Sequence, residues 1–307
     1  MSDKFRVKRY SPPTDTAHDK NAEKTAVAVI NQCKQYDFQV YTIHLSEYVQ
    51  SHTTLPEPNC VPKNKNEMEL QALLSSMSVT VGNDFFMKIK TNLFIRVAKQ
   101  LQCNYIFTAE TTATLAINLL SNLTMGRGEQ VQDDVSFYDG RNDRIKILRP
   151  MKDISKEELD YYIRMKNLHP AEQSIIQPNS LQSVIGSFVT ELQGSFPATI
   201  STICKTADKI GTSNTDQSKE KCVLCKSFLR TQSTKLTALE ATNFSRVVSL
   251  QSPNNTDLKT IEHQVNCSNE KSMFPYVNDR LCYGCSRNYL EINNSTLPRH
   301  IHDAILS

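Results

Sequence analysis

Glycine is scarce in this chain of 307 residues, and the phosphate-binding loops that depend on glycine do not occur in it. The sequence has only eight glycines. Their spacing matches neither G-x-G-x-x-G nor G-x-x-x-x-G-K-S/T, the motifs whose backbone N–H groups hold the phosphates of a nucleotide. The usual sequence signal of a nucleotide-binding enzyme is therefore missing.

Long hydrophobic runs are missing as well. No apolar stretch reaches the length of about 18 residues that a membrane span requires. The first residues, MSDKFRVKRYSPPTD, are charged and lack the apolar core of a secretory signal. The net charge of +3 permits a polyanionic partner without requiring one. The sequence thus predicts a cytoplasmic protein that does not contact membranes.

Helical and strand patterns alternate over residues 20–210. Apolar residues at helical spacing predict helices at 22–36, 67–77, 85–102, 109–123, 153–168, 181–193 and 198–210. Short apolar or alternating runs predict strands at 37–46, 103–107 and 144–151. Such alternation is typical of a Rossmann-like parallel sheet with crossover helices. Because the chain opens on a helix, we predict an incomplete α/β domain that lacks its first βα unit.

The composition predicts three regions. Residues 1–19 are polar and read as a flexible lead-in, and residues 20–210 form the α/β domain. Residues 211–307 form a small module around four cysteines, with an insert at about 227–277 that is rich in serine, threonine and asparagine. Such a composition predicts that the insert is mobile.

Two Cys-x-x-Cys pairs give the clearest local motif. They are KCVLCKS and LCYGCSR, with Cys222, Cys225, Cys282 and Cys285. Without an export signal, this pattern favours metal binding over disulfides. Four thiolates complete a tetrahedral zinc site and leave no open position, so we predict a structural zinc in a ribbon-like module. His263 and Cys267 lie between the pairs as substitute ligands that two complete pairs do not need. The alternative is two unrelated, exposed thiol pairs.

Basic residues recur in short groups, which are usually solvated surface but also suit contact with a phosphate backbone. They cluster after the predicted strands, where an anionic ligand would approach the sheet. The candidates for phosphate contact are Arg127, Arg141, Arg144, Arg149 and Lys152.

Catalytic groups are few. The segment TAETTATLAINLLSNLTMGRG, residues 108–128, directly follows a predicted strand, which is where α/β enzymes place their chemistry. Glu110 is its only ionisable residue before Arg127. His44 and His169 have no neighbouring nucleophile or carboxylate pattern, so each is expected to be a surface or packed histidine.

Several stretches resemble the second subunit of the cytoplasmic tRNA 2-thiolation complex. They are LFIRVAKQLQCNYIFTAETTATLAINLLSNLTMGRG, ILRPMKDISKEELDYYIRMKNL and GSFPATISTICKTADKI, followed by CVLC and LCYGC. The resemblance covers roughly residues 20–300. It implies a fold of the PP-loop ATP-pyrophosphatase type, a parallel α/β sheet that binds ATP at its strand ends. Members of this family normally have a further N-terminal portion, which this chain is expected to lack.

The resemblance implies a function in tRNA modification. Together with a catalytic-type subunit, this family 2-thiolates the wobble uridine of the tRNAs for lysine, glutamate and glutamine, giving 5-methoxycarbonylmethyl-2-thiouridine. An enzyme of the superfamily adenylates the C2 carbonyl of the uridine, and a sulfur donor displaces AMP. The sulfur comes from a thiocarboxylated ubiquitin-related modifier, which would be an indirect partner of this chain.

The resemblance also implies that this chain is a non-catalytic subunit of the sulfurtransferase complex. Catalytic members carry a Ser-Gly-Gly-x-Asp-Ser phosphate loop, an Asp-rich segment where this chain has TAETTATLAINLL, and cysteines in the segments that match 73–83 and 165–176. None of these features is present, so ATP binding is not expected. One alternative is an independent ATP-dependent tRNA thiolase that uses Glu110 with Cys103 or Cys204. Another is a zinc-binding adaptor without a nucleic-acid role.

Overall fold

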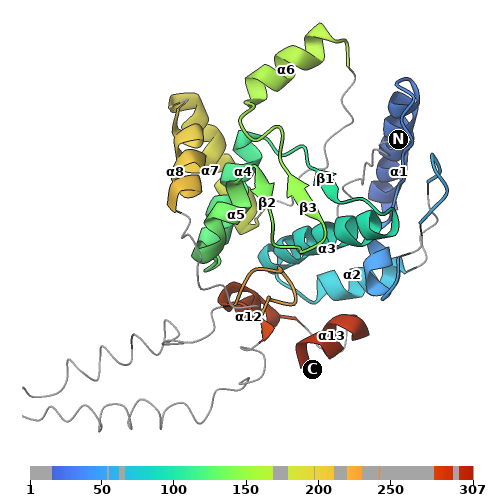
Figure 1. Cartoon of the computed structure of the whole chain (residues 1–307), viewed down its shortest axis with the longest axis vertical. Helices are drawn as coiled ribbons and strands as arrows, with labels where there is room; N and C mark the ends of the chain where they lie inside the picture. The colour runs from blue at the N-terminus through green and yellow to red at the C-terminus, as the bar shows by residue number, and fades with distance from the viewer. Residues whose placement is uncertain are drawn as a thin grey trace, which may run out of the picture.

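The structure is a computed structural model with a mixed α/β fold, in which helices surround a small sheet (Figure 1). It describes residues 16–53, 55–61, 66–168, 179–196, 198–210, 220–229, 242, 280–292 and 297–306. Residues 1–15 of the predicted lead-in, most of the predicted insert, His169, His263 and Cys267 lie outside these residues. Residues 16–19, predicted as part of the flexible lead-in, instead begin a helix.

The sheet has three strands in the order β1-β3-β2. Strands β1 (Tyr105–Phe107) and β3 (Lys146–Leu148) pair in parallel, as the sequence predicted. Strand β2 (Tyr138–Asp139) pairs with β3 in the antiparallel direction. The prediction of a purely parallel sheet is therefore corrected: the polar stretch between the helix and β3 contributes a short strand that has no apolar signal of its own.

The strand predicted at 37–46 is wrong. In the described structure, residues 38–44 are extended but pair with no strand, and a 3-10 helix follows at Leu45–Val49. The peptide of Val40 instead bonds a loop: its N–H donates to Asn59 Oδ1 at 3.2 Å, and its carbonyl accepts from Asn59 N–H at 2.7 Å. The apolar residues of this segment were read as one face of a strand, whereas they anchor a coil through Val40 and Ile43, both buried.

All seven predicted helices are confirmed, with ends displaced by a few residues. They are α1 (Thr16–Lys34), α2 (Glu67–Ser75), α3 (Val79–Gln100), α4 (Thr112–Thr124), α6 (Lys156–Met165), α7 (Leu181–Ser195) and α8 (Thr199–Ile210). The structure adds η2 (Gly128–Gln130), α5 (Val131–Val135), α12 (Tyr283–Tyr289) and α13 (Arg299–Leu306). Helix α6 begins at a complete capping box between Ser155 and Glu158, which satisfies the first free N–H groups of the helix.

Helix α3 lies between the sheet and the cysteine module, and its two faces explain this position. Ile95 and Ala98 are buried with Ile145 beside the sheet. Ile89 and Leu93 belong to a larger core that contains buried residues of α2, α12, α13 and both cysteine pairs. Because α3 is apolar on both faces, it fixes the module against the α/β domain.

Helix α4 packs with α5, α7 and α8 on one side of the sheet (Figure 1). Leu115, Ala116 and Leu119 are completely buried there. The helix predicted at 109–123 is thus a core helix. No helix of the described structure is both long enough and apolar enough to cross a membrane.

Candidate functional site

The two Cys-x-x-Cys pairs meet in space and form a four-sulfur cluster. The Sγ atoms of Cys222, Cys225, Cys282 and Cys285 all lie within 4.8 Å of one another. Cys225 and Cys282, 57 positions apart in the chain, have their Sγ atoms 3.6 Å apart. The sulfurs of both motifs thus lie at one place in the structure.

A tight hairpin turn presents the first pair. An antiparallel bridge joins Lys221 to Phe228, and Cys222 N–H donates to the carbonyl of Ser227 at 2.8 Å. Lys226, whose φ is +61°, takes the left-handed conformation that lets the chain reverse directly after Cys225. Both sulfurs of the pair consequently point to the same side.

A helix start presents the second pair. Cys282 is the N-cap residue of α12, its carbonyl accepts from Ser286 N–H at 2.8 Å, and Cys285 lies in the first turn. The backbone N–H of Val223 donates to the carbonyl of Arg280 at 3.0 Å, which ties the two pairs together.

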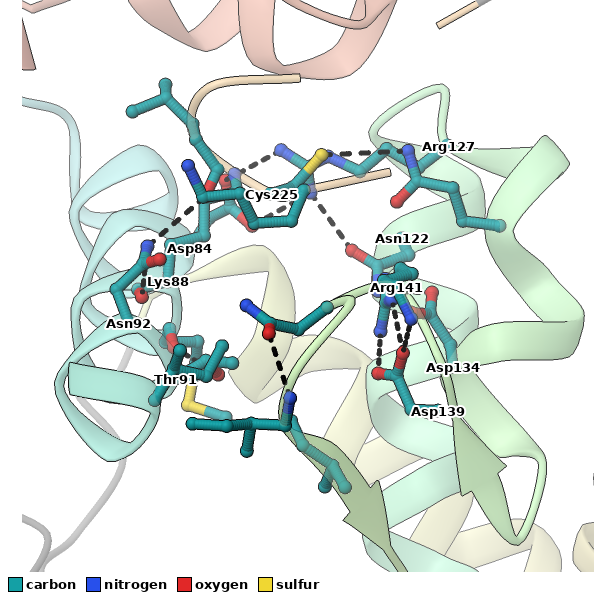
Figure 2. Close-up of a pocket in the computed structure, with 18 residues that line it drawn as sticks. Asp84, Lys88, Thr91, Asn92, Asn122, Arg127, Asp134, Asp139, Arg141 and Cys225 are labelled. Atoms are coloured by element: carbon teal, nitrogen blue, oxygen red, sulfur yellow. Dashed lines mark hydrogen bonds and ion pairs between the residues drawn. The ribbon is translucent and has the colours of Figure 1, made fainter. Parts of the chain in front are cut away.

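A buried ion pair lies beside the cluster. Arg127 donates to both carboxylate oxygens of Asp84, at 2.8 and 2.7 Å, and Lys88 also donates to Asp84 (Figure 2). Asn288 donates to the same carboxylate. Burial alone would raise the pKa of Asp84, but Lys88 and Arg127 outweigh that effect and lower it. Asp84 is therefore a carboxylate, and it holds α3, α12 and the turn after α4 together.

The surroundings of the four sulfurs fit a bound cation. Arg127 is only 3% exposed, and its Nε atom has no hydrogen-bond partner among the described residues. Arg127 lies against Gly284, between the two cysteines of the second pair. A divalent ion with four thiolates carries two net negative charges, and the net positive charge of Arg127, Lys88 and Asp84 taken together would balance one of them. An unused N–H donor in this place is what metal-bound thiolates require around them.

The thiols also influence one another. Hydrogen bonds from Cys222, and then from Cys282 and Cys285, lower the pKa of Cys225 well below its ordinary value. The hydrogen bond with Cys225, in turn, raises the pKa of Cys222. Without a cation, four such close sulfurs cannot all ionise, because each new thiolate repels the others. A metal ion removes that constraint.

A polar cavity of about 140 Å³ adjoins the cluster (Figure 2). Cys225 and Lys226 line one side of it, and the loop before β3 lines another. Arg141 bridges Asp134 at 3.1 Å and Asp139 at 2.6 Å on its wall. Burial raises the pKa of Asp134. Most of the charged side chains that line the cavity thus pair with one another.

The corner at the carboxyl ends of β1 and β3 is filled by another ion pair. Glu110 accepts from Arg149 Nε and from the Thr108 hydroxyl, each at 2.9 Å. Arg149 also reaches Asp139 at 3.3 Å. The only carboxylate of the strand-to-helix segment is therefore held by an arginine.

The structure separates the five predicted phosphate-binding residues. Arg127, Arg141 and Arg149 lie inside the protein, each bridged to carboxylates, and Lys152 pairs with Asp208 at 3.0 Å. Arg144 is the exposed member of the set. Arg127 and Arg149 thus hold distant segments together, because Asp84 and Glu110 lie 43 and 39 positions away, whereas Arg141 pairs with carboxylates of its own part of the chain.

Sequence reasoning missed Asp84 and Lys88. Part of the signal was present: Asp84 comes directly before the helix predicted at 85–102, and α3 in fact begins at Val79, which places Asp84 between Val81 and Phe85 on the buried face. A carboxylate there needs a partner, and Lys88 one turn later supplies one. His44, left as a surface or packed histidine, is buried, with Nδ1 2.6 Å from the Ser46 hydroxyl.

Comparison with known proteins gives a consistent result. The family model of Cytoplasmic tRNA 2-thiolation protein 2 matches residues 180–287, which include both cysteine pairs. Proteins of that name are 32% identical over 275 residues in Drosophila grimshawi and 29% identical over 294 residues in Drosophila virilis. These alignments cover 85% and 92% of this chain, and 65% and 70% of the relatives. Cytoplasmic tRNA 2-thiolation protein 2-A of Xenopus laevis is 28% identical, with 79% of this chain and 53% of the relative covered. The chain thus spans about half to two thirds of the length of these relatives.

Among solved structures, the U34-tRNA thiolase NcsA from Methanococcus maripaludis, solved with its 4Fe–4S cluster, has a similar fold. The TM-score is 0.50 at 14% identity, and the match covers 74% of this chain and 70% of the thiolase. The two proteins therefore share a fold.

Proposed function

Because this chain belongs to the family of Cytoplasmic tRNA 2-thiolation protein 2, we propose that it is the non-catalytic subunit of a wobble-uridine thiolation complex. It would act in the cytoplasm as a heterodimer with a catalytic-type subunit. Its tRNA substrates would be those for lysine, glutamate and glutamine, and the sulfur would reach the complex from a thiocarboxylated ubiquitin-related modifier.

The filled corner is the observation that carries the non-catalytic role. In an α/β fold, a nucleotide binds outside the carboxyl ends of the parallel strands. Here Arg149 closes that position by joining Glu110 and Asp139 in one network. Because both carboxylates are paired with Arg149, neither is available to bind Mg²⁺ or to transfer a proton. The chain therefore contributes shape and RNA contacts, and the partner contributes adenylation.

An independent thiolase would need a reactive cysteine near Glu110. Cys204 donates to the carbonyl of Thr112 at 3.6 Å, and burial raises its pKa to about 11. It is thus a protonated thiol at neutral pH, and the thiol is a poor nucleophile. Cys103 donates to the carbonyl of Leu101 at 3.6 Å, within its own turn.

Complementation tests this assignment directly. The chain is expected to co-purify with the catalytic-type subunit and to restore wobble thiolation in cells that lack the native second subunit. Glu110→Gln and Cys204→Ser are matched substitutions that keep size and hydrogen bonding, and both should still restore thiolation. Loss of thiolation in either variant, with complex formation intact, would favour the thiolase alternative.

For the four cysteines we propose one structural zinc ion. A Zn–S bond of about 2.3 Å in a tetrahedron places neighbouring sulfurs about 3.8 Å apart, close to the 3.6 Å between Cys225 and Cys282. A cube of four irons and four sulfides would have to push the thiolates farther apart. The spacing thus supports a single ion, which when bound fixes the two Cys pairs and supplies no open coordination position.

Metal analysis decides between these occupants. The purified protein should contain about one zinc per chain, with no visible absorption. Cys222→Ser and Cys285→Ser should lose zinc and unfold at lower temperature, whereas Cys60→Ser, at an exposed free cysteine, should do neither. Iron and sulfide in the protein after anaerobic purification would overturn the zinc assignment.

We propose that Arg144 contacts the phosphate backbone of the tRNA. Lys152, from the same part of the chain, is the second candidate. A zinc-binding adaptor without a nucleic-acid role is the competing reading. It predicts tRNA retention that is negligible at every salt concentration, whereas phosphate contacts give an affinity that falls steeply with salt.

A further inference from the structure

One face of the three-stranded sheet is aromatic and uncovered. The β ladder aligns Phe107, Leu148 and Tyr138 in one row across all three strands, and Tyr105 with Lys146 in the next. Residues paired in a ladder point to the same side of the sheet. Phe107 is 68% exposed, Tyr105 57% and Tyr138 48%.

The other face of the same sheet behaves as a normal interior. Ile147 and Asp139 are buried there, and Ile106 packs near Ile95 and Ala98 of α3. The contrast is sharp along β1, where Tyr105 and Phe107 face outward on either side of the half-buried Ile106. The three aromatic rings are therefore displayed by the strand register itself, and not by a mobile loop.

The exposed face is also positively charged. Lys146 holds its ammonium group 5.8 Å from the centre of the Tyr138 ring, and donates to the carbonyl of Asn142 at 3.0 Å. Arg144, two residues before Lys146, is exposed. None of the five paired residues on this face is acidic, since Asp139 lies on the opposite side.

We propose that this open sheet face, formed by Tyr105, Phe107, Tyr138, Lys146 and Leu148, binds unpaired nucleobases of RNA by stacking. Planar side chains on the two outer strands, with a cation on the strand between them, can stack successive bases while the ammonium group contacts the backbone. Because neighbouring strands lie about 4.8 Å apart and alternate residues about 7 Å apart, the rings are spaced for separate bases. The proposal rests on the proposed role in tRNA modification, and identifies the RNA part recognised as single-stranded.

A protein partner is the competing occupant, and charge argues against it. A protein interface core is typically depleted of lysine, whereas Lys146 lies in the middle strand between two of the rings. The chemistry of the face, aromatic and cationic without acids, is complementary to bases and phosphates.

The absence of tryptophan in the chain allows a direct test. Phe107→Trp places a single tryptophan on the face, and Phe188→Trp, at a 52% exposed position of α7, is the matched control. Both variants are titrated with single-stranded oligoadenylate and with a duplex of the same length. Stacking predicts quenching of the tryptophan at 107 by the single strand, weak quenching by the duplex, and none at 188.

Affinity supplies the second readout. Phe107→Ala and Tyr138→Ala should each weaken binding of oligoadenylate roughly tenfold, within the range measured for base–aromatic stacking, and Phe188→Ala should not. Equal quenching at positions 107 and 188 would overturn the proposal, as would unchanged affinity in both alanine variants. If the fluorescence of the Phe107→Trp variant changes with the catalytic-type subunit alone and not with RNA, the face is a protein interface instead. Restored thiolation together with no response to oligoadenylate would overturn only the stacking face, and leave the proposed function standing.

Discussion

Arg127 and Asp84 form a two-pronged ion pair, 2.8 and 2.7 Å, between segments 43 positions apart. The pair is almost completely buried and lies beside the cysteine cluster. Its carboxylate comes from the start of α3, its guanidinium from the turn after α4, and Asn288 of α12 donates to the same carboxylate at 2.6 Å. The α/β domain and the cysteine module are thus joined through one charge.

Removal of that charge should destabilise the protein strongly. Asp84→Asn leaves Arg127 and Lys88 buried without a counter-charge, and breaking a buried pair in this way typically costs about 3–5 kcal/mol. Urea unfolding of the protein as purified, with its metal content kept equal between variants, measures the change. Asp143→Asn removes the partner of Lys221 at the surface, where solvent screens the pair, and should change little. Equal effects of the two substitutions would contradict the structural role of Asp84.

Local patterns in the sequence account for the helices, for β1 and β3, and for the cysteine site. Apolar residues at helical spacing mark α4 and α7, and each Cys-x-x-Cys pair brings two sulfurs to one side of a turn. The ion pairs could not be predicted in the same way. Arg149 was read as a surface cation because Glu110 and Asp139 lie 39 and 10 positions away, and no local period connects them.

The wrong prediction of a strand at 37–46 shows the same limit of local sequence patterns. Residues 37–46 alternate well enough to predict a strand, but a strand requires a neighbour with free N–H and carbonyl groups. The peptide of Val40 bonds Asn59 instead. In contrast, β2 has a neighbour but only two residues, too few to show any alternation.

His300 should make the stability depend on pH below neutrality. Its Nε2 atom accepts from Arg96 at 2.8 Å, and its ring packs edge-on against Tyr48. Burial, and then the charge of Arg96, lower the pKa of His300 to about 4, against a small opposing effect of Asp303. The unfolded chain has the ordinary pKa of about 6.5, so it binds the proton more readily than the folded protein.

Stability from this contact is therefore complete above pH 6.5 and is lost as the pH falls toward 4. Because thiolates of the cysteine site also bind protons in acid, the comparison must be between variants. His300→Phe keeps a ring against Tyr48 and should show a smaller loss of unfolding free energy between pH 7 and pH 5 than the parent protein. If the unfolding free energies of the two proteins fall equally between pH 7 and pH 5, His300 is not the source of the pH dependence.

Arg144 should contribute to tRNA affinity in a way that the buried arginines cannot. It is exposed, so Arg144→Ala would remove the proposed phosphate contact without disturbing an ion pair between described residues. Binding should weaken, and the slope of log affinity against log salt should fall by about one. Arg141→Ala breaks the contacts to Asp134 and Asp139, and should lower the unfolding temperature first. Filter binding over a salt series, with thermal unfolding of each variant, separates the two effects.

Gly284 should be required where α12 packs on the rest of the protein. A Cβ atom at this position would lie 2.6 Å from the carbonyl oxygen of Met125 and 2.7 Å from Cγ of Arg127. The carbonyl is part of the backbone and cannot swing away, so α12 itself would have to shift. Such overpacking typically costs about 1–3 kcal/mol, although alanine is the better helix former.

Gly194 of α7 provides the matched control, because a Cβ atom there meets nothing within 4 Å. Gly194→Ala should leave the unfolding temperature unchanged or raise it slightly, through the better helix propensity of alanine. Gly284→Ala should lower the temperature and speed the transfer of zinc to a coloured chelator, since Cys282 and Cys285 move with α12. An alanine at 284 that is tolerated as well as the one at 194 would show that α12 does not rest on the turn after α4 as closely as the structure places it.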